Sequence, residues 1–238
     1  VGDFTLYAEN ADAGDYSIVQ WRNANTETLW PNQTVDEPVI AELFADIRFR
    51  EALNIAIDRE AINELVYAGL AEARQASPIS GSQFYDAEYE TKWTEYDPQR
   101  ANQLLDEIGL TEFNGDGLRL RPDGEPLIIR IDTPLFQTTI DSLELVSAFW
   151  QDVGIGTNIN VMDRSLYLDR ANANDIMMGH WGWGRDYFVA NPGRWLGEIN
   201  DGSFGLAYGN FHAGREPAIE PPADHPIWDV WAAWERAS

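Results

Sequence analysis

The 238-residue chain contains no cysteine, a single lysine (Lys92) and only three histidines. The absence of cysteine excludes disulfides, thiolate zinc sites and cysteine nucleophiles, although a chain of this length can fold without such cross-links. No apolar run approaches the roughly 20 residues that a membrane-spanning helix needs. The sequence also lacks a basic segment followed by an apolar one near its start, so we expect no signal peptide in it.

Basic residues are scarce beside acidic ones. The chain has 16 Lys and Arg against 40 Asp and Glu, which gives a formal net charge of −24 and a pI near 4.2. Such a surface repels phosphate backbones and anionic lipids, so we expect no nucleic-acid partner and no role at a membrane surface. Solubility accounts for the acidity, and a salt-rich habitat in which the charge is screened is the alternative.

Residues 46–69 have the pattern of two consecutive helices. Asp58 is placed to cap the second helix, because its side chain can accept hydrogen bonds from the free amides of the first turn. The first helix has an apolar face at helical spacing, formed by Phe49, Ala52, Leu53, Ala56 and Ile57. The second helix has a shorter apolar stripe, formed by Ile62, Leu65 and Val66. The pattern alone predicts core architecture.

The exact residues of this segment are more informative than its apolar spacing. Residues 46–52 (DIRFREA) and 56–59 (AIDR) resemble the signature of the extracytoplasmic solute-binding proteins of ABC importers, family 5. Members of that family carry oligopeptides, dipeptides, nickel and some oligosaccharides. Residues 96–109 resemble the same family: Asp97 and Pro98 open a third helix, and Gly109 ends it. The buried stripe of this third helix is expected at Ala101, Leu104, Leu105 and Ile108.

Beyond these helices, the pattern predicts an α/β fold, a mixed sheet with flanking helices. Residues 3–8 and 16–22 are predicted to form a hairpin, residues 24–45 an ordered loop, and residues 70–96 an irregular segment. The elements expected after the third helix are, in order, a second hairpin (117–122 and 127–132), a long helix (138–153), a strand (157–162), a short helix (164–172) and a strand (175–181).

The last part of the chain is predicted to be a long loop over residues 201–222 and a helix over 225–236. Trp150 and the series Trp228, Trp231 and Trp234 fall on helical faces and are expected in the core. The resemblance implies that residues 1–238 form one ligand-binding lobe, the second lobe of a two-lobe protein. Residues 1–45 would be its entry segment, and residues 201–238 would return toward a missing N-terminal lobe.

Residues 179–187 (GHWGWGRDY) are the best candidate site, just beyond a predicted strand, where α/β folds place ligand groups. Glycines let a ligand approach the backbone closely, and aromatic rings offer flat apolar faces. The candidate ligand-binding residues are His180, Trp181, Trp183, Arg185, Asp186 and Tyr187. The alternative is a surface pair of Arg185 with Asp186 and two tryptophans, Trp181 and Trp183, in the core.

Part of this segment resembles the W-x-x-D-Y element of the oligopeptide-binding members, through Trp183, Asp186 and Tyr187. The resemblance implies that Asp186 holds the α-amino group of a peptide, and a fixed carboxylate suits an ammonium group. The chain departs from the family afterwards, because residues 188–190 delay the proline that often follows the tyrosine. The position of Asp186 therefore stays open.

Catalytic and metal-binding motifs are absent. The histidines are isolated, and residues 114–117 (NGDG) lack the alternating oxygen ligands of a calcium loop and instead predict a turn. Nothing in the spacing of the acidic residues singles out the carboxylate pair of a glycosidase. We therefore expect no enzyme, no cofactor and no metal ion.

The resemblance implies the solute-binding component of an ABC importer in the periplasm or elsewhere outside the cytoplasm. It would capture an oligopeptide by hinge closure and deliver it to a membrane permease. An oligosaccharide is the second ligand class, because tryptophans near residue 181 can stack on sugars. A carbohydrate-active hydrolase and a sensor or adaptor that binds proteins are the alternatives of other classes. One lobe supplies only half of a cleft, so we expect this chain alone to bind weakly.

Overall fold

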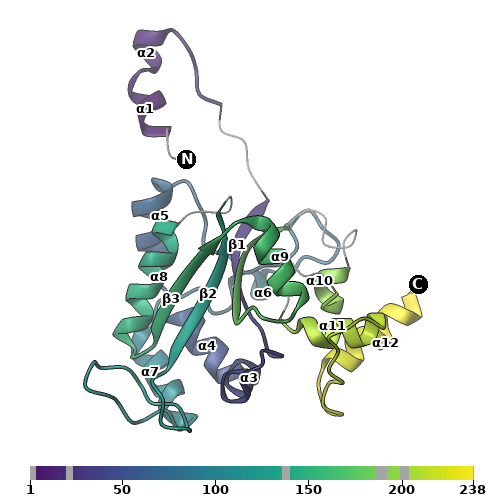
Figure 1. Cartoon of the computed structure of the whole chain (residues 1–238). Coiled ribbons are helices and arrows are strands. Elements are labelled where there is room, and N and C mark those ends of the chain that lie inside the picture. Colours follow the sequence, from purple (N-terminus) through teal and green to yellow (C-terminus); the bar gives the residue numbers. More distant parts are fainter. Residues whose placement is uncertain (1–3, 20–23, 136–139, 186–191, 199–203, 238) are drawn as a thin grey trace.

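The computed structural model describes residues 4–19, 24–135, 140–185, 192–198 and 204–237 (Figure 1). A four-stranded mixed sheet lies at the centre, with the strand order β1-β4-β2-β3. The strands are β1 (Asn25–Pro31), β2 (Ile128–Pro134), β3 (Gly156–Met162) and β4 (Met178–Gly184). β2 is parallel to β3 and β4, whereas β1 runs antiparallel to β4. The predicted fold class is therefore confirmed.

Helices cover both faces of the sheet. One face carries α3 (Pro38–Ala45), α4 (Ile47–Ile55), α5 (Arg59–Tyr67), α7 (Pro98–Glu107) and α8 (Ile140–Asp152). The other face carries α9 (Arg164–Asn172). The remaining described helices are α1 (Phe4–Glu9), α2 (Ala11–Gly14), α6 (Ala87–Thr91), α10 (Gly193–Leu196), α11 (Leu206–Ala213) and α12 (Ile227–Ala237). Side chains alternate along a strand, so Met178 enters the core under α8 whereas Trp181 packs under α9.

The residues that resemble the family signature act at helix junctions. The Asp46 carboxylate accepts a hydrogen bond from the backbone N–H of Arg48 at 2.8 Å and caps α4. The Arg50 guanidinium donates to the carbonyl oxygen of Ala45 at 2.8 Å, at the end of α3. Because the last carbonyls of a helix have no partner within the helix, this contact joins the two helices.

The second junction is built in the same way. The Asp58 carboxylate accepts from the backbone N–H of Ala61 at 2.9 Å, so the predicted cap is confirmed. The Arg59 guanidinium donates to the carbonyl oxygen of Asn54 at 2.8 Å, near the end of α4. Burial lowers the pKa of Arg59 to about 10. The predicted apolar face of α4 is fully buried, but the prediction for Leu65 on α5 is wrong, since that residue is 72% exposed.

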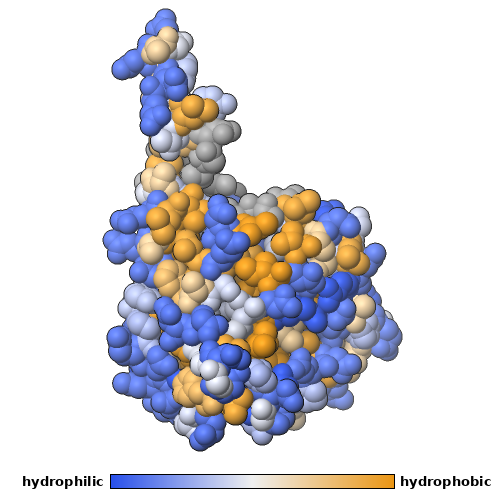
Figure 2. Space-filling view, turned by 60° about the vertical axis from the view of Figure 1, so that its left-hand side comes forward, coloured by the Kyte–Doolittle hydropathy of each residue, from blue (hydrophilic) through white to orange (hydrophobic). Residues whose placement is uncertain are grey.

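The predicted N-terminal hairpin is wrong. Residues 4–14 form α1 and α2, and no residue of either helix is buried. Figures 1 and 2 show this arm standing clear of the body. A strand with alternating side chains needs a sheet face to cover, and none lies beside the arm. A helix makes its hydrogen bonds within its own segment, so it needs no partner strand.

The predicted loop over residues 24–45 is also wrong, because it contains β1 and α3. Pro31 is the last residue of β1, at an edge of the sheet, and proline is tolerated at edge strands. Pro38 opens α3, where its missing N–H costs nothing. Both prolines therefore mark boundaries of regular elements.

Four further predictions need correction. The second hairpin retains only an isolated bridge between Leu120 and Pro126 around its turn, because β2 pairs with β3 and β4 instead. β4 begins at Met178, three residues later than the start predicted at 175. Residues 206–213 of the predicted loop form α11. Trp150 is buried as predicted, and Trp231 likewise, but Trp228 is half-buried and Trp234 is exposed.

Across the described residues, no helix has both the length and the apolar character that crossing a bilayer requires. Hydrophilic residues dominate much of the face in Figure 2.

The cap at Asp58 provides a test of the helix pair. We expect Asp58→Ala to lower the free energy of unfolding by about 1 kcal/mol, because the first turn of α5 loses an acceptor for its free amides. For a chain of this size the melting temperature should fall by about 2–4 °C. Glu64→Ala, an exposed change in the same helix, is the matched control. Equal melting temperatures for both variants would contradict the capping role.

Candidate functional site

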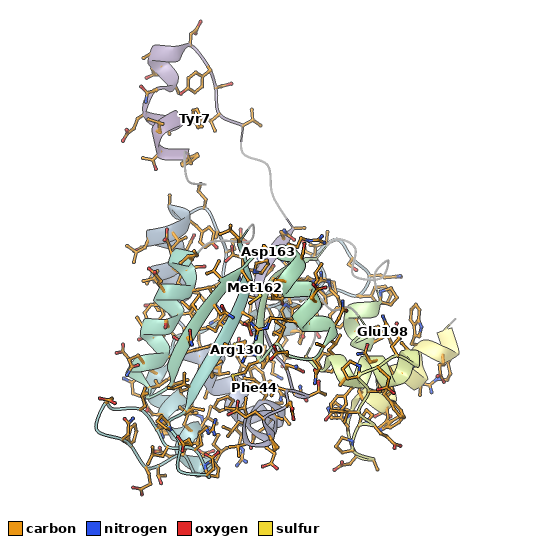
Figure 3. All side chains as sticks on the ribbon, in the orientation of Figure 1. Tyr7, Phe44, Arg130, Met162, Asp163 and Glu198 are labelled. Carbon is orange, nitrogen blue, oxygen red and sulfur yellow. The ribbon has the colours of Figure 1, made fainter. Side chains whose placement is uncertain are left out.

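The carboxyl ends of β2 and β4 lie side by side. From β2 the chain crosses through α8 to β3, and from β3 it crosses through α9 to β4 on the other side of β2. Figure 3 places Met162 and Asp163 at the carboxyl edge and Arg130 farther down the sheet. In open α/β sheets, ligands bind outside the carboxyl ends of two neighbouring strands whose connections lead to opposite sides, a position called the topological switch point. We therefore take this edge as the candidate site.

A chain of polar contacts runs along one face at this edge. The hydroxyl of Thr133 and Nδ1 of His180 are hydrogen-bonded at 2.9 Å. On the other side of the ring, Nε2 of His180 lies 3.7 Å from Oε2 of Glu27, and the same oxygen accepts a hydrogen bond from the Ser142 hydroxyl at 3.2 Å. Thr133 and His180 are buried, whereas the Glu27 side chain is 37% exposed. This series of polar contacts thus leads from the interior to the surface.

Gly182 is the accessible point of β4. Every other residue of the strand is buried, and Gly182 pairs in register with Glu27 of β1. A glycine projects no side chain from the sheet, so a ligand can approach the backbone of the strand there. The surface between Glu27 and Gly182 therefore offers a carboxylate beside approachable main-chain groups.

Trp181 and Trp183 lie on the opposite face of the sheet. The Trp181 ring packs against Tyr167 of α9, with 5.3 Å between ring centroids. Trp183 stacks on Trp30 at 5.1 Å and meets Trp195 edge-on at 4.7 Å. The two tryptophans of β4 are only 7% and 2% exposed. Neither one presents a free ring face on which a sugar could stack.

The Arg185 guanidinium is buried and binds protein groups. It donates to the carbonyl oxygen of Ser77 at 2.8 Å and forms an ion pair with Glu90. The backbone N–H of Arg185 also donates to the carbonyl oxygen of Ala24 at 3.1 Å, just before β1. Arg185 thus fixes the end of β4 to two other segments of the chain.

Glu90, in turn, gathers several donors. Its carboxylate accepts from the Tyr85 hydroxyl at 2.9 Å and pairs with Arg74 at 2.5 Å, in addition to Arg185. Burial is the largest single effect and raises the pKa of Glu90, but hydrogen bonds from Tyr85, Arg185 and Arg74 together hold it below its ordinary value. The hydrogen bond to Glu90 also raises the pKa of Tyr85. A buried carboxylate with three donors joins the segment 74–90 to β4.

The structure therefore separates the residues that the sequence grouped together. His180 lies at the switch point, Trp181 and Trp183 pack on the other face, and Arg185 is held by Glu90. Asp186 and Tyr187 lie outside the described residues. The reasoning from sequence missed four residues: Glu27, Glu90, Thr133 and Ser142. The order of helices and strands could have indicated the switch point, but nothing marks Glu27 or Glu90 among forty acidic residues.

A hollow of about 290 Å³ lies away from this edge, with Asp36, Arg130 and Asp175 in its lining. Arg130 is itself paired with Asp132 and Asp175. In the part of the chain that the structure describes, no group of three or more histidine, aspartate or glutamate residues is arranged to hold a metal ion.

The fold and this edge define the class of protein. Residues 4–203 match the model of the family described as bacterial extracellular solute-binding proteins, family 5 Middle. The chain belongs to this family. It is 31% identical to heme-binding protein A of Haemophilus influenzae over 144 residues, which are 60% of this chain and 24% of that protein. It is 29% identical to the oligopeptide-binding protein AppA of Bacillus subtilis over 134 residues, 55% of this chain and 24% of that protein.

Solved structures of other proteins have a fold similar to that of this chain. An oligopeptide-binding protein OppA matches with a TM-score of 0.82 and 33% identity, over 99% of this chain and 40% of that one. NikA of Brucella suis, in complex with Fe(III)-EDTA, matches with a TM-score of 0.68 and 20% identity, over 98% of this chain and 42% of that one, and so shows the fold alone. The chain thus spans well under half the length of the relatives that it matches.

The contacts of Glu90 predict how stability depends on pH. The pKa of Glu90 is lower in the folded protein than its ordinary value of 4.5. Its ionised form therefore stabilises the fold fully above about pH 4.5, and this contribution is lost as the pH falls through the folded pKa. Removing the charge with Glu90→Gln leaves Arg185 buried without its carboxylate, so we expect a loss of about 3 kcal/mol at pH 7.

The measurement is urea unfolding of both proteins between pH 7 and pH 3. The difference between wild type and Glu90→Gln should be largest at pH 7 and should shrink as the pH falls below 4.5. Glu88→Gln, an exposed change in the same helix, is the control and should behave as wild type. A difference that does not vary with pH would refute the assignment.

Proposed function

We propose that this chain is the ligand-binding lobe of an ABC importer's solute-binding protein, and that its solute is an oligopeptide. Membership of the family supports the general role. The relatives named for oligopeptide binding support the ligand class. In this proposal the intact protein works outside the cytoplasm. It closes a second lobe of the same chain over the solute and delivers it to a membrane permease.

The observation that carries the proposal is the accessible backbone of Gly182 at the carboxyl end of β4. A peptide needs partners for its backbone N–H and C=O groups when it leaves water. Gly182 supplies approachable main-chain groups, and Glu27 lies beside it in register. The buried His180 of β4 is hydrogen-bonded to Thr133 of β2, which joins the two strands at this edge. Asp186 follows two residues after Gly184, and we propose that it holds the α-amino group of the peptide.

The other classes of function have less support. The reason to expect an oligosaccharide was the tryptophans near residue 181, and Trp181 and Trp183 are both buried. A hydrolase needs two carboxylates facing each other across a cleft, about 5–9.5 Å apart, and the family consists of binding proteins. Turnover of a chromogenic glycoside would nevertheless favour a hydrolase over the proposal made here.

The role of Asp186 can be tested in the intact protein. Asp186→Ala should weaken the binding of tetraalanine by about 10- to 100-fold, because a charge-assisted hydrogen bond to the ammonium group is lost. The melting temperature should change by less than about 2 °C. Isothermal titration calorimetry measures the affinity, and Asp152→Ala at the end of α8 is the control. An unchanged affinity would remove Asp186 from the site.

A further inference from the structure

We propose that Glu27 is a specificity residue of the site, which selects peptides with a positively charged side chain at one position. This inference rests on the proposed function. It adds a preference for one kind of ligand side chain, which contacts with the backbone of β4 alone would not give. Three observations support it: where the residue lies, how it is held and how far it is exposed.

The location of Glu27 is set by the sheet. β1 runs antiparallel to β4, and Glu27 is the register partner of Gly182. Directly paired residues of antiparallel strands project on the same face, so the carboxylate stands beside the position where β4 has no side chain. A peptide that passes over Gly182 therefore places one of its own side chains next to Glu27.

The carboxylate is positioned by one hydrogen bond and by a buried ring beside it. The Ser142 hydroxyl, in the first turn of α8, donates to Oε2 at 3.2 Å. Nε2 of His180 lies 3.7 Å from the same oxygen, and the His180 ring is fixed by its hydrogen bond to Thr133 at 2.9 Å. A carboxylate that is oriented before the ligand arrives loses less conformational entropy on binding.

The exposure of Glu27 suits recognition. Its side chain is 37% exposed, whereas His180 beneath it is 2% exposed. The carboxylate can therefore contact a ligand while the groups that orient it remain out of water. A partly desolvated carboxylate favours an ammonium or guanidinium group and disfavours a carboxylate on the ligand. The expected preference is therefore lysine or arginine over alanine, and alanine over glutamate, at a single peptide position.

The experiment uses the intact protein and a set of synthetic tetrapeptides. Tetraalanine is the reference, and lysine or glutamate replaces each alanine in turn. Calorimetry should find one position at which lysine increases affinity by about tenfold over alanine. Glu27→Gln should abolish that preference, so that the lysine peptide and tetraalanine bind it with equal affinity. Glu27→Asp, which keeps the charge, should retain part of the preference, and Glu144→Gln, an exposed change on α8, should retain all of it.

The outcomes separate this inference from the proposed function. A lysine preference in wild type that survives in Glu27→Gln overturns the inference and leaves peptide binding standing. An equal loss for all peptides in Glu27→Gln shows that the residue is structural, and likewise overturns it. A failure of wild type to bind any of the tetrapeptides overturns both.

Discussion

The pairing of β4 between β1 and β2 is the constraint on which the rest of the structure depends. It sets His180 beside Thr133, places Gly182 opposite Glu27 and turns Trp181 toward α9. Because side chains alternate along a strand, a shift of one residue in this register would exchange the two faces. The tryptophans would then face the core under α8, and His180 would face α9. The environment of every candidate residue from 180 to 185 follows from this single pairing.

Arginine side chains secure the loops around this sheet. Arg59 closes the end of α4, and Arg185 reaches Ser77 and Glu90. The buried Arg119 donates to the carbonyl oxygen of Val153 at 2.8 Å and to Oδ1 of Asn102 at 2.7 Å. A guanidinium group presents several N–H donors in one plane, so it can satisfy carbonyls from separate segments at once. This use is consistent with a chain in which fifteen of the sixteen basic residues are arginine.

Local signals predicted the capped helices and the approximate positions of three strands, but not how the strands pair. Asp58 and Asp97 lie at their caps, because capping depends only on amides within three residues. The sequence predicts a loop in place of β1 and the wrong partner for β2, because a strand's partner lies far away in the sequence. Pairs such as Leu29 with His180 are separated by about 150 positions, and no local pattern reports them.

The sequence by itself determined the family, the α/β class, the helix pair and the segment in which to look for a site. These features are encoded in residues close together along the chain, where spacing and capping act directly. Only the tertiary structure decided which residues of that segment face the candidate site. Glu27 reaches Gly182, and Glu90 reaches Arg185, through contacts that burial and strand pairing create. A charged side chain has the same local signature whether it is solvated or buried in an ion pair, so its role is settled only by its neighbours in space.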